Sequence, residues 1–256
     1  MITTSWDDGH PEDLRLAELL KSYDISGTFY IPRRNRESRD VMTGGQIRSL
    51  SSAFEVGGHT IDHLALTVVD PHTAGTQIHG CKEWLEDLTS RPINGFCYPR
   101  GQYNEQIKQM TRIAGFKYAR TVKNLFDHPG RDPFALSTTV QFAPTSGAVY
   151  LRNYLKSRMH AFIDREAGLP NIRLLSAALT IRRLVDRVRH LADLCERSGG
   201  VFHLWGHSWE ITQYGLWDDL RESLKHLAGY GTDVQFGSNL DVVSSRSRDL
   251  PDRSQC

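Results

Sequence analysis

Short apolar runs alternate with longer amphipathic segments along most of this chain. The apolar runs predict strands at residues 2–6, 27–31, 55–58, 96–98, 117–120, 201–205 and 233–236. Apolar residues at helical spacing predict helices at 12–23, 43–53, 71–88, 105–114, 150–166, 177–197 and 217–227. An alternation of strands and helices is typical of a mostly parallel sheet with helices outside it.

The chain length indicates how such a sheet closes. At 256 residues we expect one α/β barrel, closed or nearly closed, rather than an open doubly wound sheet. The less regular middle predicts a helical insertion at about 145–175 within a barrel of residues 1–243, followed by a polar tail at 244–256. The sequence has neither a GxGxxG nor a GxxxxGK[ST] motif, so nucleotide-binding folds are disfavoured. Active sites of such barrels lie at the carboxyl ends of the strands.

Composition limits the classes of partner and the cellular location that we expect. The net charge is +1 and 39% of residues are hydrophobic, so nothing favours nucleic acid as a partner. The start of the sequence lacks a signal-peptide pattern, and no apolar run approaches the roughly 20 residues of a membrane span. The four cysteines are far apart and form no CxxC pair. We therefore expect a cytoplasmic protein with no transmembrane segment.

Potential metal ligands follow two of the predicted strands. Asp7 and Asp8 come after the first strand, and His59 and His63 after the third. On a helical turn, HxxxH spacing puts both imidazoles on one face, about 5–6 Å apart at Cβ. One aspartate and two histidines leave open positions, as a catalytic zinc site requires, and the second carboxylate is free to act as a base. Thr60 replaces the glutamate of HExxH, which disfavours a zincin protease.

Each of these segments also has a plainer interpretation. Asp7-Asp8-Gly9 fits a turn before a helix, and an HxxxH spacing alone is a weak signal. Asp62, between the histidines, is expected to be solvated or to cap a helix. The segment 95–104 fits either a turn or a groove wall that offers a backbone N–H to an oxyanion.

A late strand brings further candidates. His203, Trp205 and His207 share one face of the predicted strand 201–205 and its end. We expect His203 to be buried and hydrogen-bonded. Trp205 and Trp209 are candidate ligand contacts, and their plainer interpretation is packing, as for most buried aromatics.

Taken in order, these segments resemble the polysaccharide deacetylase superfamily, carbohydrate esterase family four, over roughly residues 1–240. Ser5-Trp6-Asp7-Asp8-Gly9 stands in place of its TFDDG motif, and His59-Thr60-Ile61-Asp62-His63 matches H-[ST]-x-x-H. Cys97-Tyr98-Pro99-Arg100-Gly101 matches R-x-P-[YF]-G in part, and Trp205-Gly206-His207 fits a late apolar-x-His motif. We find no match to the family's D-x-x-D-W motif.

The resemblance implies a distorted (β/α)7 barrel and a role for each matched position. It implies metal ligands at Asp8, His59 and His63, a catalytic base at Asp7, and a general acid at His207. The third motif implies substrate contacts at Tyr98 and Pro99, with the Arg100 backbone N–H at the oxyanion position. The family arginine that orients the base falls on Cys97, so Arg100 is the candidate replacement.

These features predict a metal-dependent deacetylase that hydrolyses the N-acyl amide, N-acetyl above all, of an amino sugar. Zn²⁺ suits the ligands, and Co²⁺, Ni²⁺, Mn²⁺ or Fe²⁺ would fit the same set. Without an export signal, we expect an intracellular N-acylated sugar as the substrate, either sugar-nucleotide-linked or lipid-linked. Trp205 and Trp209 could supply apolar platforms for its ring. The alternatives are a related C–N hydrolase, such as a lipid-linked amino-sugar deformylase, and a catalytically inactive carbohydrate-binding barrel.

The segment 149–167 combines apolar and basic residues. Its apolar stripe consists of Leu151, Leu155, Met159, Phe162 and Ile163, and positive charge comes from Arg152, Lys156, Arg158 and Arg165. A helix packed on the barrel through this stripe is the plainest interpretation. The alternatives are a lip over the site that contacts phosphate, and a peripheral attachment to a membrane surface.

Overall fold

The computed structural model describes residues 1–163 and 168–249. Within them, seven strands form one sheet in the order β5-β4-β3-β2-β1-β7-β6, and every pair is parallel. The strands are β1 (Ile2–Asp7), β2 (Thr28–Ile31), β3 (Glu55–Gly58), β4 (Gly95–Cys97), β5 (Tyr118–Arg120), β6 (Val140–Gln141) and β7 (Phe202–Gly206). The predicted distorted (β/α)7 barrel is confirmed.

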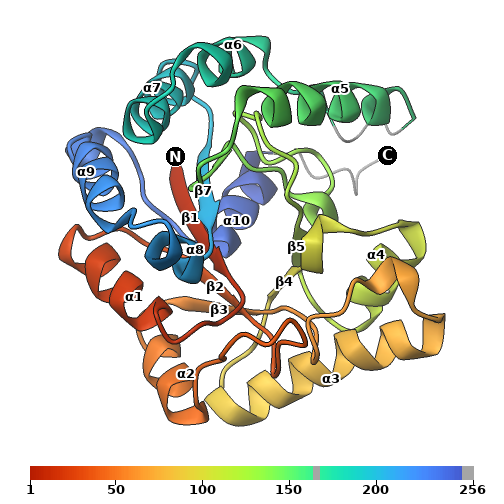
Figure 1. Ribbon diagram of the computed structural model, residues 1–256. Helices are drawn as coiled ribbons and strands as arrows, with labels where there is room; N and C mark the ends of the chain where they lie inside the picture. The colour runs from red at the N-terminus through yellow and green to blue at the C-terminus, as the bar shows by residue number, and fades with distance from the viewer. Residues whose placement is uncertain (164–167, 250–256) are drawn as a thin grey trace.

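One segment spans the gap between the two ends of the sheet. Leu136 pairs in parallel with Arg120 of β5, and four residues later Val140 of β6 pairs with Leu204 of β7. Because the same stretch of chain bonds to both sides, the sheet curls into a nearly closed barrel (Figure 1).

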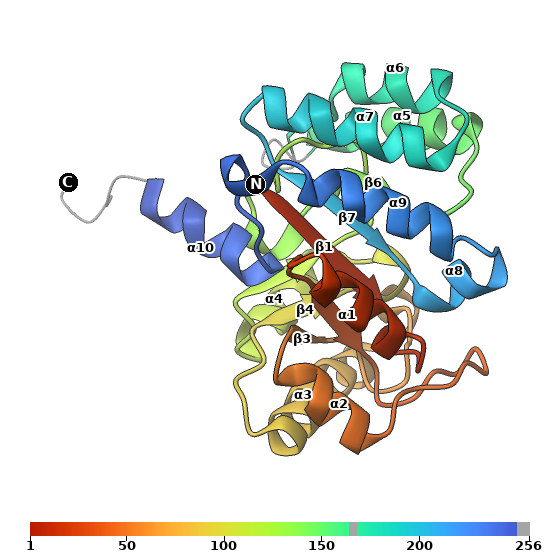
Figure 2. The ribbon, with the colours of Figure 1, turned by 90° about the vertical axis from the view of Figure 1, so that its left-hand side faces the viewer.

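Most of the helices surround the barrel on its outside (Figure 1). The helices of the described residues are α1 (Asp13–Ser22), α2 (Gly44–Ser51), α3 (Pro71–Thr89), α4 (Glu105–Ile113), α5 (Gly147–Ile163), α6 (Ile172–Thr180), α7 (Leu184–Arg197), α8 (Ser208–Gln213), α9 (Trp217–Ala228) and α10 (Asn239–Asp249). Thr43, Asp70 and Asn104 cap the N-termini of α2, α3 and α4 with their side chains. Figure 2 shows β1 and β7 pointing toward the side where α8 lies, with α10 toward the opposite side.

Two glycines make room for two tyrosines in the sheet. A Cβ atom at Gly57 would lie 2.5 Å from the ring of Tyr30, and one at Gly95 would lie 2.2 Å from the Tyr118 hydroxyl. The Tyr30 hydroxyl donates to that of Tyr118 at 3.2 Å, which in turn donates to Glu55 at 2.8 Å. This buried polar layer satisfies its own hydrogen bonds.

Some predicted elements were wrong. The helix predicted at 177–197 is two helices, α6 and α7, because the chain leaves helical geometry at Ile181. The buried Arg187 guanidinium stabilises this break by donating to the carbonyls of Ile181 and Thr145. The strand predicted at 233–236 is wrong, since Phe236 makes only one bridge, to Ile2.

Other elements were not predicted. The strand β6 has only two residues, too few for a periodic pattern. The helices α8 and α10 were also missed, and α10 extends to Asp249, inside the predicted polar tail. The remainder of that tail, residues 250–256, lies outside the described residues.

The predicted packing of the stripe on α5 was wrong. Leu151, Leu155 and Met159 are 42%, 53% and 71% exposed. The helix packs instead through Tyr150 and Tyr154, which are buried. These two tyrosines combine apolar area with a polar end, so a count of aliphatic residues selects the wrong face. The side chains of Phe162 and Ile163, and all of Arg165, lie outside the described residues.

Among the described helices, none has both the length and the apolar character required to cross a bilayer.

Candidate functional site

The end of β1 places two carboxylates in different surroundings. Asp7 is the last residue of β1, and Asp8 follows it with φ 78°, in the left-handed region. Asp and Asn adopt this conformation more readily than most residues. The turn breaks the strand alternation, so both adjacent carboxylates, 3% and 2% exposed, line the same pocket.

The two histidines after β3 face Asp8. The Nε2 atoms of His59 and His63 lie 3.6 and 3.2 Å from Asp8 Oδ1, and their ring centroids are 4.9 Å apart. This segment is a loop with positive φ at Thr60 and His63, not a helical turn. Non-glycine residues in this region are strained, and such strain concentrates at functional sites.

The donor set of Asp8, His59 and His63 fits a divalent metal. One donor atom from each residue lies within 4.8 Å of the others. Asp8 Oδ1 is buried, yet it has no hydrogen-bond partner in the described part of the chain. Burial alone would raise the pKa of Asp8, but the His59 and His63 imidazoles outweigh it and hold that pKa far below its ordinary value. An ionised carboxylate beside two imidazoles is the ligand chemistry that Zn²⁺ and related ions take.

A second group of potential donors consists of Asp7, His59 and Cys97. The ring Nδ1 of His59, however, already forms a 2.8 Å hydrogen bond with the Cys97 carbonyl oxygen. This bond leaves Nε2 of His59 for a metal and directs it toward Asp8. Burial raises the pKa of the Cys97 thiol, so it is protonated and a poor ligand. The geometry therefore favours the set with Asp8.

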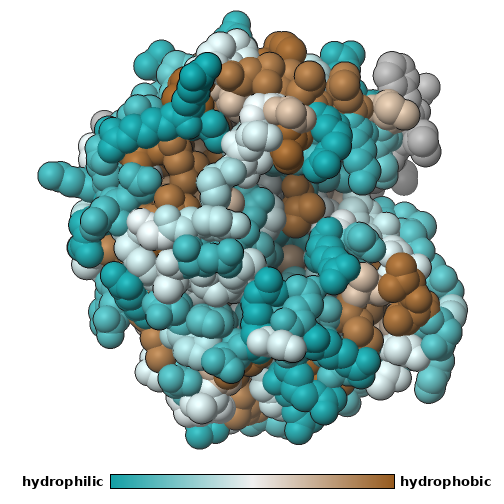
Figure 3. Space-filling view, viewed as in Figure 1, coloured by the Kyte–Doolittle hydropathy of each residue, from teal (hydrophilic) through white to brown (hydrophobic). Residues whose placement is uncertain are grey.

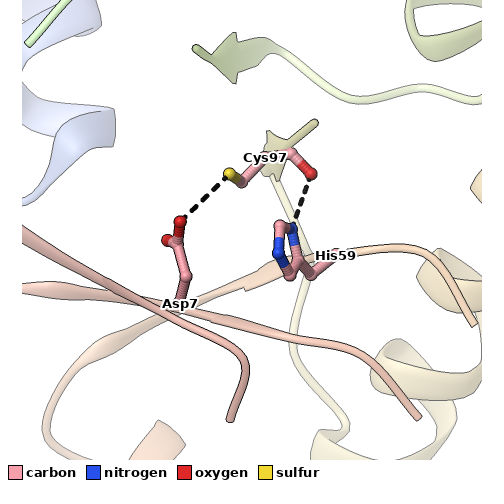
Figure 4. Close-up of side chains that lie close together, drawn as sticks. All are labelled: Asp7, His59 and Cys97. Carbon is pink, nitrogen blue, oxygen red and sulfur yellow. Dashed lines mark hydrogen bonds between the residues drawn. The ribbon is translucent and has the colours of Figure 1, made fainter. Parts of the chain in front are cut away.

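Asp7 is held by two side chains from neighbouring strands. The guanidinium of Arg120, at the end of β5, is fully buried and forms an ion pair with Asp7 Oδ1. The Cys97 thiol points at Asp7 Oδ2 from β4 and lies 3.7 Å away (Figure 4). The guanidinium of Arg120 also contacts two aromatic rings, with its Cζ 5.3 and 4.8 Å from the centroids of Tyr30 and Trp205.

The side chain of Arg100 does not replace the family arginine. It is 58% exposed and forms a 2.8 Å ion pair with Glu37 in the loop after β2. Its place beside Asp7 is taken by Arg120, because β5 ends next to Cys97 in the sheet. Arg100 still lines the pocket, with φ 58°, so its backbone remains a candidate for the oxyanion role.

His207 follows β7 and faces the same pocket. Its Nδ1 is 2.6 Å from Glu210 Oε2, in the first turn of α8. Burial would lower the pKa of His207, but the hydrogen bond to Glu210 and the charges of Asp8 and Asp7 outweigh it and raise that pKa. The imidazolium form is thus favoured, as a proton donor requires.

The pocket has a volume of about 350 Å³. It is lined by Asp7, Asp8, Glu37, Arg39, His59, His63, Arg100, Val122, Trp205, His207 and Trp209. Trp209 donates its indole N–H to Asp8 Oδ2 at 2.9 Å, and the Arg39 guanidinium stacks 3.8 Å from its ring centroid. The indole nitrogen of Trp205 is buried without a hydrogen-bond partner among the described residues.

Two predicted substrate contacts lie away from this pocket. The ring of Tyr98 is buried in the core, stacks on Tyr103, and donates its hydroxyl to the Phe134 carbonyl at 3.0 Å. Pro99 is buried at the start of a short 3-10 helix. Neither residue lines the pocket, whereas Arg100, which follows them, does.

Two polar residues near the site have structural roles. Asp62, predicted to be solvated or capping, is instead buried, and it bonds Gln77 and the guanidinium groups of Arg34 and Arg36. It thereby anchors the loop after β2 to the His59–His63 segment. His203 is buried and bonds Ser5 at 2.8 Å, and burial lowers its pKa to about 3. His203 therefore stays neutral, in line with the expectation of a buried, hydrogen-bonded residue.

Sequence reasoning missed Glu37, Arg39, Arg120 and Glu210. Arg120 ends a predicted strand, where an isolated charge after apolar residues is a usable signal. Glu210 stands three residues after His207, a spacing that brings side chains together in a helical turn. Glu37 and Arg39 lie in a loop of charged residues whose path no local pattern indicates.

Comparisons with known proteins agree with this fold. A family model described as polysaccharide deacetylase matches residues 1–119. The chain is similar in structure to a putative polysaccharide deacetylase from Mycobacterium smegmatis, with 17% identity, a TM-score of 0.67, and 100% of this chain and 93% of that chain covered. None of the curated protein sequences matches the chain.

Two further structures extend the comparison. A chitin deacetylase from Colletotrichum lindemuthianum has 13% identity and a TM-score of 0.59, covering 94% of this chain and 86% of that one. A family 4 acetyl xylan esterase from Clostridium thermocellum, in complex with a cobalt ion, has 11% identity and a TM-score of 0.57, covering 98% and 92%. At these identities the likeness shows a shared fold. The residues that match the family model include Asp7, Asp8, His59 and His63, so residues 1–119 of the chain are similar to polysaccharide deacetylases.

Proposed function

We propose that this protein is a metal-dependent deacetylase that hydrolyses the N-acyl amide of an amino sugar. One observation carries the proposal. A buried ionised carboxylate and two imidazoles surround one point, and a second carboxylate, oriented by an arginine, lies in the same pocket. This arrangement fits hydrolysis assisted by a metal and a general base.

Asp8, His59 and His63 would hold the metal, with Zn²⁺ the expected ion and Co²⁺, Ni²⁺, Mn²⁺ or Fe²⁺ able to fit the same ligands. When bound, the ion would polarise the acyl carbonyl and the attacking water as a Lewis acid. The hydrogen bonds from His59 to the Cys97 carbonyl and from Trp209 to Asp8 fix the ligand orientations from outside.

In this proposal, Asp7 and His207 transfer the protons. Asp7 accepts a proton from water as the water oxygen bonds to the acyl carbon, and the ion pair with Arg120 fixes the carboxylate for this step. His207 then donates its proton to the amine nitrogen as the C–N bond breaks, and Glu210 holds the imidazole in place. The products are a free amine and a carboxylic acid, which ionises in water.

Substrate contacts would come from the walls of the pocket. The backbone N–H of Arg100 is the proposed oxyanion donor, and the rings of Trp205 and Trp209 are the proposed sugar contacts. The buried indole N–H of Trp205 lacks a partner among the described residues, so a substrate oxygen would satisfy it.

An Asp7→Asn variant tests the proposal. It should keep its metal, measured by elemental mass spectrometry, and release amine from N-acetyl and N-formyl amino sugars at least about 10²–10⁴ times more slowly. Asp87→Asn, an exposed change on α3, is the matched control and should behave as the wild type. Near-normal turnover by Asp7→Asn would refute the base, and a wild type that binds metal but hydrolyses no N-acyl sugar would indicate a carbohydrate-binding barrel.

A further inference from the structure

A second cavity, of about 430 Å³, adjoins the catalytic pocket. Arg100 and Val122 line both, so the two cavities lie side by side. The other residues that line it are Thr67, Gly101, Gln102, Tyr103, Lys123, Asn124, Asn153, Lys156, Ser157 and His160. Figure 3 shows a hollow near the middle of this face of the molecule, bordered largely by hydrophilic side chains.

The lining of this cavity has a positive charge. Arg100, Lys123 and Lys156 are cationic, His160 adds an imidazole, and none of the described lining residues is an aspartate or glutamate. Arg100 is paired with Glu37, and Lys123 and Lys156 add two further cationic groups to the lining. The Lys123 ammonium lies 3.4 Å from His160 Nδ1, which brings the two basic groups to one point.

The insertion helix α5 forms one wall of the cavity. Asn153, Lys156, Ser157 and His160 follow the spacing i, i+3, i+4 and i+7, which is one face of a helix. Lys123 comes from the other side, three residues beyond Arg120 at the end of β5. Apolar side chains of this region gather instead along the upper edge of the molecule, over α5 and α6 (Figure 3). The polar face of α5 is thus turned toward the site.

We propose that this cavity binds a phosphate or diphosphate group carried by the amino-sugar substrate. The inference rests on the proposed function, because the sugar itself would occupy the catalytic pocket. Lysine ammonium groups bind phosphate as point charges, and amide and hydroxyl groups such as those of Asn153 and Ser157 can donate to the remaining oxygens. A volume of about 430 Å³ leaves room for the phosphate and part of the group beyond it.

Binding can be measured without catalysis. Inorganic pyrophosphate is titrated calorimetrically into metal-free protein, so that the ion cannot attract the probe. The double variant Lys123→Ala/Lys156→Ala should bind at least about tenfold more weakly than the wild type. Lys117→Ala is the matched control, because this exposed lysine lies just before β5 whereas Lys123 lies just beyond it. Equal affinity in the double variant and the wild type would overturn the proposal.

Kinetics then separates this inference from the proposed function. We expect kcat/KM to be higher for a phosphorylated substrate than for N-acetylglucosamine. The phosphorylated substrates to test are N-acetylglucosamine 1-phosphate, UDP-N-acetylglucosamine and a polyprenyl-phosphate N-acyl sugar in detergent micelles. The double variant should reduce this preference at least about tenfold. The substrate with the highest kcat/KM of the three shows whether the phosphate belongs to a soluble or to a lipid-linked sugar. Hydrolysis with no preference for any phosphorylated sugar would overturn the inferred phosphate site, but the proposed deacetylase activity would still stand. Pyrophosphate binding that depends on the two lysines, without hydrolysis of any sugar tested, would support the phosphate site and contradict the proposed deacetylase activity.

Discussion

The two side chains that hold Asp7 are direct neighbours across two strands. Cys97 of β4 and Arg120 of β5 are register partners in a parallel pair. Such partners project from the same face of the sheet, with the strands about 4.8 Å apart. A guanidinium can therefore reach the same carboxylate from either strand, and Arg120 does so from β5.

Exchanging these two side chains tests this explanation at the level of single residues. Arg120→Cys should lower kcat at least about 10²-fold, because Asp7 loses the group that orients it. The double variant Cys97→Arg/Arg120→Cys has the wild-type composition, and its kcat should be at least about tenfold higher than that of Arg120→Cys. Metal content, measured for every variant, should stay unchanged. Full activity of Arg120→Cys alone would show that Arg120 does not position the base.

At the level of elements, the first turn of α8 controls the proton on His207. Glu210 raises the pKa of His207, and a general acid works only while it is protonated. Activity should therefore be lost as the pH rises through this pKa. Glu210→Gln removes the negative charge and lowers the pKa, so the alkaline limb of the kcat/KM profile should move to lower pH.

A control separates this shift from a general loss of activity. Glu83→Gln removes a carboxylate from α3 that is 65% exposed and paired only with the exposed His79 among the described residues. Its pH profile should match that of the wild type. If Glu210→Gln lowered the activity equally at every pH, Glu210 would serve packing, and His207 would not be the group titrated on that limb.

Some features of the site and fold can be predicted from local sequence patterns, and others depend on tertiary contacts. Asp8, His59 and His207 follow apolar strands, so strand prediction alone directs them to one end of the barrel. The role of Arg120 depends on the register of β4 against β5, which no local pattern encodes. The break between α6 and α7 depends on Arg187, which bonds Thr145 from 42 residues away. Tertiary contacts of this kind override local helical patterns.

At the scale of the whole molecule, the candidate metal ligands link strands that are not neighbours. Asp8 follows β1, whereas His59 and His63 follow β3, and β2 lies between these strands in the sheet. All three ligand residues are at most 9% exposed. An ion bound by this set would favour the folded barrel, because the unfolded chain does not hold the three ligands together.

Thermal unfolding of chelator-treated protein should therefore depend on added Zn²⁺. At 100 times Kd, ligand binding stabilises the folded state by about 2.7 kcal/mol, or roughly 5–10 °C in Tm for a chain of this size. His63→Ala removes one ligand and should lose most of this shift. His79→Ala removes an imidazole that is 60% exposed on α3 and should retain it. An equal rise in Tm for both variants would place the stabilising ion elsewhere, since only His63 belongs to the proposed set.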